Sequence, residues 1–105
     1  MTDTRQRLPN RRAHEVIGFT FRGREYLAVV AHYPDGRPAE LFIDPIKGGA
    51  DATADARDAA VAASLAFQHG VSIQCLRDAL TRDQNGTAAG VLGAALDAMT
   101  GVAQQ

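Results

Sequence analysis

The sequence predicts an α+β fold in which a three-stranded antiparallel β-meander is followed by two to three α-helices packed on one of its faces. Two observations carry this prediction. Up to about residue 45, apolar residues alternate with a period of two, and the candidate strands are separated by short turns. From about residue 50, apolar residues recur with helical spacing in alanine-rich stretches.

The predicted strands cover residues 14–21, 25–33 and 38–44. In the first strand Ile17, Phe19 and Phe21 share one face, as expected of a half-buried strand. The second strand is apolar on both faces, which predicts a central strand covered by helices on one side. The turns at 22–24 and 33–37 contain Gly, Pro and Asp-Gly, and such short turns join antiparallel neighbours.

Two to three helices are predicted for the second half of the chain. The first has Asp51 or Thr53 as its N-cap and runs to His69, with Gly70 as a left-handed C-terminal cap. Ser72 caps the second helix, and the two helices form a tight hairpin or corner at Gly70. The last helix starts at about residue 88, after a polar turn. Its apolar side carries Val91, Leu92, Ala95, Leu96 and Met99.

The 105 residues suffice for one domain. We expect a flexible basic arm over residues 1–13 and a single α+β domain over residues 14–103. The formal net charge of −1 provides no global field for binding nucleic acid or a membrane. No apolar run approaches 18 residues and no secretory signal pattern opens the chain, so the predicted location is the cytoplasm, without membrane contact.

The arm is the most basic part of the chain, because four arginines oppose only Asp3 and give a local charge of +3. We expect such an arm to contact an anionic partner or to fold back on its own body. Nucleic-acid binding is therefore the alternative function, with solvated arginines as the plainer interpretation. The candidate contacts in the arm are Arg5, Arg7, Arg11 and Arg12.

Lys47 is a further candidate anion contact, because Lys47-Gly48-Gly49 stands before a predicted helix start. Exposed backbone donors, a helix N-terminus and a lysine would suit a phosphate. The complete phosphate-loop spacing is absent, however, and Asp51 and Asp55 compete for the same positive field. A plain strand-to-helix connection is the favoured interpretation.

Histidines and the single cysteine predict no reaction chemistry. His14 and His32 are expected side by side on neighbouring strands, but two histidines without a cysteine or a suitable carboxylate make a poor metal site. Cys75 lies in the first turn of a predicted helix without a histidine placed to act as its base, so we expect a small buried core residue. No catalytic residue, metal or cofactor is predicted.

Several stretches resemble one known family. They are RLPNRR at 7–12, YPDGRPAELF at 33–42, ARDAA at 56–60, AFQHGV at 66–71, RD at 82–83, NG at 85–86 and LGAALD at 92–97. Together they resemble the TSCPD domain, the accessory C-terminal domain of adenosylcobalamin-dependent ribonucleotide reductases. The similarity is greatest to free-standing bacterial proteins made of that domain alone, and it covers residues from about 7 to 100.

The resemblance implies a non-catalytic accessory or regulatory module that acts through protein–protein contact, with a protein partner in deoxyribonucleotide metabolism. Reductase versions carry a downstream cysteine-bearing tail, whereas residues 100–105 hold no cysteine. No thiol relay or cysteine-bound metal is therefore carried over. The radical, cobalamin and nucleotide sites of the reductase lie in its other domains, so none of them is carried over either.

Self-association is predicted from the last helix. Gly90 and Gly93 weaken this helix by about 1 kcal/mol each relative to alanine, yet it keeps an apolar stripe. A body this small has little apolar surface to cover the stripe, so we expect it to form a twofold homodimer. In the alternative, the helix folds back onto the sheet of its own chain. The candidate interface residues are Val91, Leu92, Leu96 and Met99.

Overall fold

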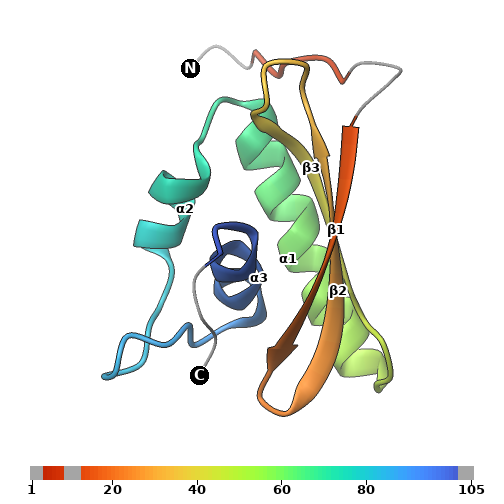
Figure 1. Cartoon of the computed structure of the whole chain (residues 1–105), viewed down its shortest axis with the longest axis vertical. Coiled ribbons are helices and arrows are strands. Elements are labelled where there is room, and N and C mark those ends of the chain that lie inside the picture. Colours follow the sequence, from red (N-terminus) through yellow and green to blue (C-terminus); the bar gives the residue numbers. More distant parts are fainter. Residues whose placement is uncertain (1–3, 9–12, 102–105) are drawn as a thin grey trace.

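A computed structural model describes residues 4–8 and 13–101, and it confirms the predicted α+β fold (Figure 1). The sheet order is β1-β2-β3, and both neighbouring pairs are antiparallel. The helices lie on one side of the sheet, and no described element covers the other side (Figure 1). The elements are β1 (Ala13–Phe21), β2 (Arg24–His32), β3 (Pro38–Pro45), α1 (Ala50–Gln68), α2 (Ile73–Ala79) and α3 (Val91–Met99).

The β1–β2 turn sets the register of the first two strands. Its two residues, Arg22 and Gly23, have φ values of 50° and 75°, which suit the twist of a two-residue hairpin. Phe21 consequently pairs with Arg24, and Phe19 pairs with Tyr26. The rings of Phe19 and Tyr26 stack in the core with centroids 5.3 Å apart.

The core lies between the helices and the covered face of the sheet. Its α1 side chains are mostly alanines, which let the helix backbone approach the sheet closely. Phe67 is the one large α1 side chain in this cluster. The buried apolar residues of the core cluster are Phe19, Tyr26, Ala28, Val30, Leu41, Ile43, Ala56, Ala60, Ala63, Phe67, Ala88, Ala94, Ala95 and Leu96.

The prediction for the start of the first helix is wrong. The N-cap of α1 is Gly49, which has an extended backbone and no side chain to cap with. Asp51 lies inside the first turn instead. The Thr53 hydroxyl donates to the Gly49 carbonyl oxygen (3.2 Å), so it bonds back along the helix rather than capping it. The short connection from β3 brings the helix start forward to Ala50.

The predicted cap at the end of α1 is confirmed. Gly70 has a φ of 94°, its N–H donates to the Phe67 carbonyl, and the Val71 N–H donates to the Ala66 carbonyl, both at 3.0 Å. This pair of bonds is the Schellman motif. Ser72 then caps α2 as predicted, because its hydroxyl accepts from the Cys75 N–H at 3.0 Å.

The path after the first helix differs from the prediction in part. Of the two alternatives at Gly70, a tight hairpin or a corner, the structure has the corner, because the main helix partner of α2 is α3. The last helix begins at Val91 and not near residue 88, because Arg82 and Ala88 form an antiparallel bridge first. Gly90 is the N-cap of α3, so it does not weaken the helix interior.

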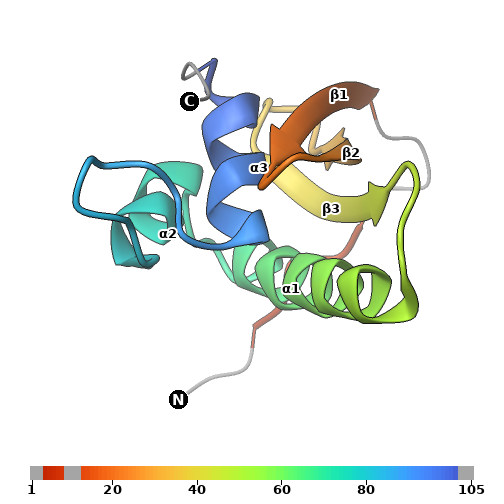
Figure 2. The same cartoon turned by 90° about the horizontal axis from the view of Figure 1, so that it is seen from below.

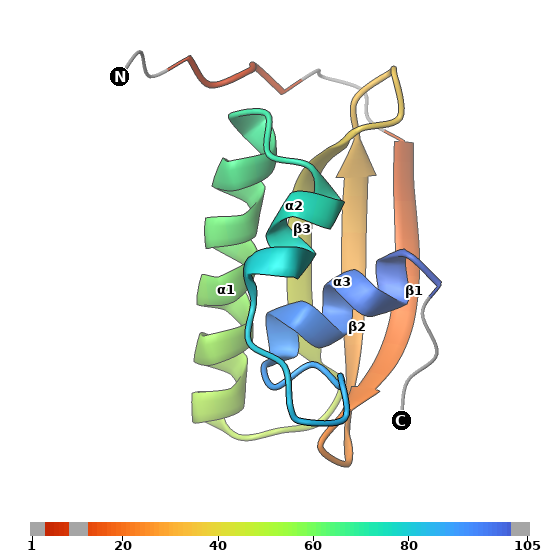
Figure 3. The ribbon, with the colours of Figure 1, turned by 90° about the vertical axis from the view of Figure 1, so that its left-hand side faces the viewer.

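The apolar stripe of α3 is used inside the chain. The helix crosses the covered face of the sheet and contacts β1, α1 and α2 (Figure 2; Figure 3). Leu96 is 0% exposed, and Val91, Leu92 and Met99 pack partly buried against the core. The prediction of an exposed stripe is therefore wrong, and the fold-back alternative describes the helix. Dimerisation itself stays a prediction, without this stripe as its surface.

Replacing Gly70 with valine should destabilise the fold. A β-branched residue resists the left-handed backbone that the Schellman motif requires, so Gly70→Val should lower the free energy of unfolding by roughly 1 kcal/mol or more. Urea denaturation measures the change. Gly49→Ser is the matched control, because serine is at least as good an N-cap as glycine and a Cβ at residue 49 meets open space. An unchanged midpoint for Gly70→Val would contradict the cap.

Candidate functional site

The uncovered face of the sheet carries an apolar row across all three strands. Val16 pairs with Val29, and Val29 pairs with Phe42. Successive side chains alternate between the faces, so this row points away from the core. Val16 is 64% exposed and Phe42 is 47% exposed, and Leu27 is exposed in the next row. An antiparallel sheet commonly leaves one face to water, and that face is usually polar, so an apolar row on it is unusual.

A groove extends this face towards α1. The helix runs beside β3 (Figure 2), and the space between the two has a volume of about 310 Å³. Phe42 lines the strand side of the groove, while Val61 and Leu65 line the helix side. Arg57 and Asp44 also line the groove and form an ion pair of 2.8 Å.

All the large exposed apolar side chains of the described residues belong to this side of the molecule. The uncovered sheet face contributes four of them, counting Ile46, whose N–H donates to the Glu25 carbonyl at 2.9 Å. The outer side of α1 contributes two. A contiguous apolar surface of this kind is typical of a protein interface. We call it the open face, defined by Val16, Leu27, Val29, Phe42, Ile46, Val61 and Leu65.

Sequence reasoning missed the open face, although a signal was present. The prediction covers β2 with helices on one side, and it makes no statement about the apolar residues on the other face of that strand. Val16 and Phe42 each pair with Val29, so their side chains point to the same uncovered face of the sheet. Three apolar side chains aligned across the strands, on the face away from the helices, predict an apolar uncovered face.

Two α1 side chains hold the helix against the outer edge of β3. The Ser64 hydroxyl accepts from the Leu41 N–H at 2.8 Å, and the same oxygen lies 3.1 Å from the Leu41 carbonyl oxygen. Gln68 Nε2 donates to the Ala39 carbonyl at 2.9 Å. These bonds satisfy backbone groups that an edge strand would otherwise leave unpaired. They also set the position of α1, and hence the groove.

The described part of the arm, residues 4–8, lies against the end of α1. Gln6 donates its N–H to the Gln68 carbonyl at 2.7 Å, and the Tyr33 hydroxyl donates to the Gln6 carbonyl at 3.0 Å. Arg5 Nε donates to Gln68 Oε1, and Arg5 also lines the groove. Arg7 is exposed.

Arg11 and Arg12 lie outside the described residues. Lys47, the remaining basic candidate, lies at one end of the sheet, and the basic residue Arg37 lies at the other. At the β1–β2 end, Arg24 donates to the Lys47 carbonyl (3.1 Å), and the Lys47 residue is exposed. At the β2–β3 end, Arg37 pairs with Asp35 at 2.7 Å and donates to the Gln6 side chain at 2.7 Å. Lys47 therefore lies at the opposite end of the sheet from Arg37 and the described part of the arm, and nucleic-acid binding stays a prediction.

Nucleic-acid binding through the arm should depend on its arginines and on salt. Changing the four arm arginines (Arg5, Arg7, Arg11 and Arg12) to glutamine should abolish binding of a labelled oligonucleotide in fluorescence anisotropy. Binding by the unchanged chain should fall steeply between about 50 and 200 mM salt, because phosphate contacts release counterions. Lys47→Gln tests the second candidate contact separately. Equal binding by the variant with the four arm arginines changed would contradict a role for the arm.

The histidines do not come together as expected. His14 pairs with Ala31, so the neighbouring His32 points to the opposite face of the sheet. His32 instead has its Nε2 atom 3.7 Å from Glu15 Oε1. Within residues 4–8 and 13–101, no group of three or more His, Cys, Asp and Glu side chains is placed to hold a metal ion.

The prediction that Cys75 is a core residue is wrong. The residue is exposed on α2, while Ile73 and Leu76 of the same helix pack against the core. The helix has seven residues and none of them is fully buried, so only one side of it meets the body. Cys75 lies on the other side.

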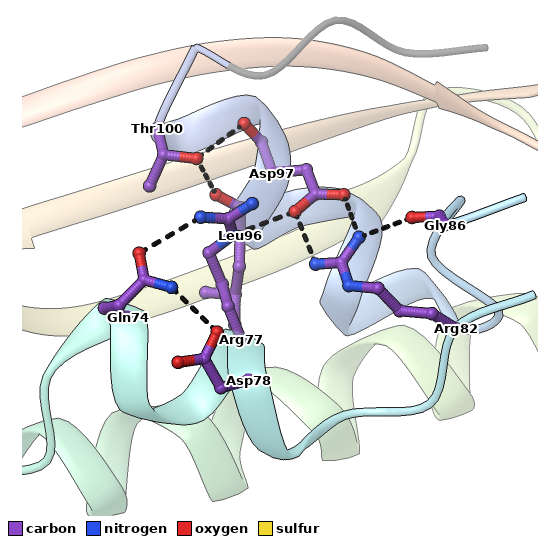
Figure 4. Close-up of polar contacts among 8 residues, drawn as sticks. All are labelled: Gln74, Arg77, Asp78, Arg82, Gly86, Leu96, Asp97 and Thr100. Atoms are coloured by element: carbon purple, nitrogen blue, oxygen red, sulfur yellow. Dashed lines mark hydrogen bonds and ion pairs between the residues drawn. The ribbon is translucent and has the colours of Figure 1, made fainter.

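A buried carboxylate joins α3 to the segment before it (Figure 4). Asp97 accepts from Arg77 Nε at 2.9 Å, and from both terminal nitrogens of Arg82 at 2.8 and 2.9 Å. Arg82 also donates to the Gly86 carbonyl at 3.0 Å. The Asp97 side chain is 9% exposed. The hydrogen bond from Arg82, followed by that from Arg77, holds the pKa of Asp97 below its ordinary value, against the opposing effect of burial.

Removing the charge of Asp97 should destabilise the fold. Asp97→Asn leaves two partly buried guanidinium groups without their counter-charge, so the free energy of unfolding should fall by roughly 3 kcal/mol. Urea denaturation at neutral pH measures it. Asp78→Asn is the control, because Asp78 is exposed and its side chain accepts from Gln74. A difference below about 0.5 kcal/mol between the two variants would contradict this role.

Acid should remove the same contribution. Because folding lowers the pKa of Asp97 below 3.8, its stabilisation is complete above about pH 5 and is lost as the pH falls through the folded value. The stability difference between the natural chain and Asp97→Asn should therefore shrink at acidic pH. Denaturation curves measured from neutral to acidic pH check this, and a constant difference would contradict the assignment.

No helix in the described ranges is long and apolar enough to cross a membrane. The fold and its surface define a small α+β domain with one uncovered apolar face. Comparison with known proteins then points to one enzyme.

The chain is 36% identical over 72 residues to a vitamin B12-dependent ribonucleotide reductase of Rhodopirellula baltica. That match covers 69% of this chain and 7% of the enzyme. It is also 36% identical over 77 residues to the vitamin B12-dependent ribonucleotide reductase of Agrobacterium fabrum, covering 73% of this chain and 6% of that enzyme. No family model matches the chain, and no solved structure matches it. The chain is thus similar to one small part of these reductases.

Proposed function

We propose that this chain is a non-catalytic accessory or regulatory module, corresponding to the TSCPD domain of adenosylcobalamin-dependent ribonucleotide reductase, and that it acts through protein–protein contact. The observation that carries the proposal is the 36% identity to a segment that makes up only 6–7% of the reductase. A segment of that size is the scale of one accessory domain. The setting is deoxyribonucleotide metabolism, with the reductase as the protein partner.

The open face supports action by contact. It presents the apolar row and the groove on one side of the molecule, with charged side chains such as Glu25 and Glu40 on the same sheet face. An apolar centre with polar surroundings is the usual anatomy of a protein interface. Because the face lies opposite the core, a partner can cover it without disturbing the fold.

The use of the buried polar side chains also supports a non-catalytic role. Ser64 and Gln68 bond to the backbone of β3, and Asp97 bonds to two arginines. Each of these groups has a structural partner within the chain. A nucleophile or general base needs a neighbour that activates it towards a substrate, and these groups are arranged to hold elements together instead.

Binding to the vitamin B12-dependent reductase of the same organism tests the proposal. We expect the purified chain to bind the immobilised reductase with little dependence on salt, since the contact is apolar. Phe42→Glu should weaken binding by more than about tenfold, because it places a charge in the interface. Biolayer interferometry measures both.

Gln84→Glu is the matched control, since it adds the same charge at an exposed turn away from the open face. It should bind as the natural chain does. Absence of binding by the natural chain would refute the reductase as partner. Unchanged binding by Phe42→Glu would remove the open face from the contact.

A further inference from the structure

We infer that in the isolated chain a second copy covers the open face, in a twofold dimer that places Val16 of each copy in the groove of the other. The inference deepens the proposed function, because it names an occupant for the contact surface on which that function rests. Self-association uses the chain alone, so its failure is distinguishable from a failure to bind the reductase.

The shape of the open face favours a second copy. Val16 stands on the outer strand β1 and is the most exposed large apolar side chain of the described residues. The groove lies on the far side of the same cross-strand row, between Phe42 and Val61. One surface therefore carries a projecting side chain at one margin and a matching recess at the other.

With twofold symmetry, the contact between Val16 and the groove forms twice in the dimer, once from each copy. An axis parallel to the strands, between β2 and β3, places β1 of one copy over α1 of the other and β2 over β3. Val16 then meets Val61 across the groove, and Val29 meets Phe42. Both contacts occur twice, as an isologous interface requires. Every member of the central row meets an apolar side chain.

The area of the open face reaches the lower limit of a specific interface. Three strands about 4.8 Å apart and a helix about 10 Å wide give a face roughly 24 Å across. Seven residues at about 3.3 Å each make it roughly 23 Å long. Two such faces would bury about 1,100 Å² together, which exceeds the roughly 1,000 Å² expected of a specific interface.

The charges lie outside the central row. Val16, Val29 and Phe42 are uncharged, and the next row places Leu27 of one copy against Asp44 of the other, whose carboxylate pairs with Arg57 at 2.8 Å. The formal net charge of −1 means that two copies repel each other weakly. The interface inferred here is on the opposite side of the sheet from α3, whose Leu96 is buried in its own chain.

A charge-exchange experiment tests the dimer and its geometry. Sedimentation equilibrium at micromolar concentration should give about 22 kDa for the natural chain, twice its 11.1 kDa. Val16→Lys and Val61→Glu should each raise the dimer dissociation constant by more than about tenfold, because each places one charge against an apolar partner. Mixing the two variants should restore the dimer, because lysine and glutamate then face each other across the groove.

Gln84→Lys and Gln84→Glu are the matched controls and should remain dimeric, alone or mixed. Circular dichroism should show that every variant is folded, as expected for changes at exposed positions. A natural chain of about 11 kDa would overturn the inference, and so would dimers that persist in both single variants. Two monomeric variants that stay monomeric when mixed would overturn the pairing of Val16 with Val61.

Discussion

The attachment of α1 to the edge of β3 determines the architecture of this domain. Ser64 bonds to the backbone of Leu41, and Gln68 bonds to the carbonyl of Ala39, so a helix occupies the place of a fourth strand. The small residues beside them, Ala60 and Ala63, allow the close approach that these bonds need. The same placement turns Val61 and Leu65 outward, and it thereby creates the groove of the open face.

In the second half of the chain, polar contacts hold the short apolar helix α3 against the core. Asp97 draws Arg77 and Arg82 onto α3 and so anchors α2 and the following turn over it. The apolar residues of α3 are then buried in the core or packed against it. What remains for a partner is the far side of the sheet, so the surface available for function is separated from the groups that hold the fold together.

The candidate site was less predictable than the fold. The similarity to part of a ribonucleotide reductase follows from local stretches of sequence, and it suggests a setting. The open face depends instead on which of the two alternating sets of side chains on each strand is covered by the helices. Cys75 was expected to be buried and the α3 stripe to be exposed, and both expectations were reversed. Hydrophobicity alone does not say which of several apolar surfaces will be covered when a small chain has too few elements to cover them all.

The sequence by itself determined the strands, the turns and the caps at Gly70 and Ser72, because these depend on residues a few positions apart. Only the tertiary structure decided that Asp97 would meet Arg77 and Arg82, which lie 20 and 15 residues away. It also decided the course of α3 across the sheet and the exposure of Val16. Such outcomes depend on how complete elements pack together. The free energies of the alternative packings depend on contacts between residues far apart in the sequence, which no local pattern contains.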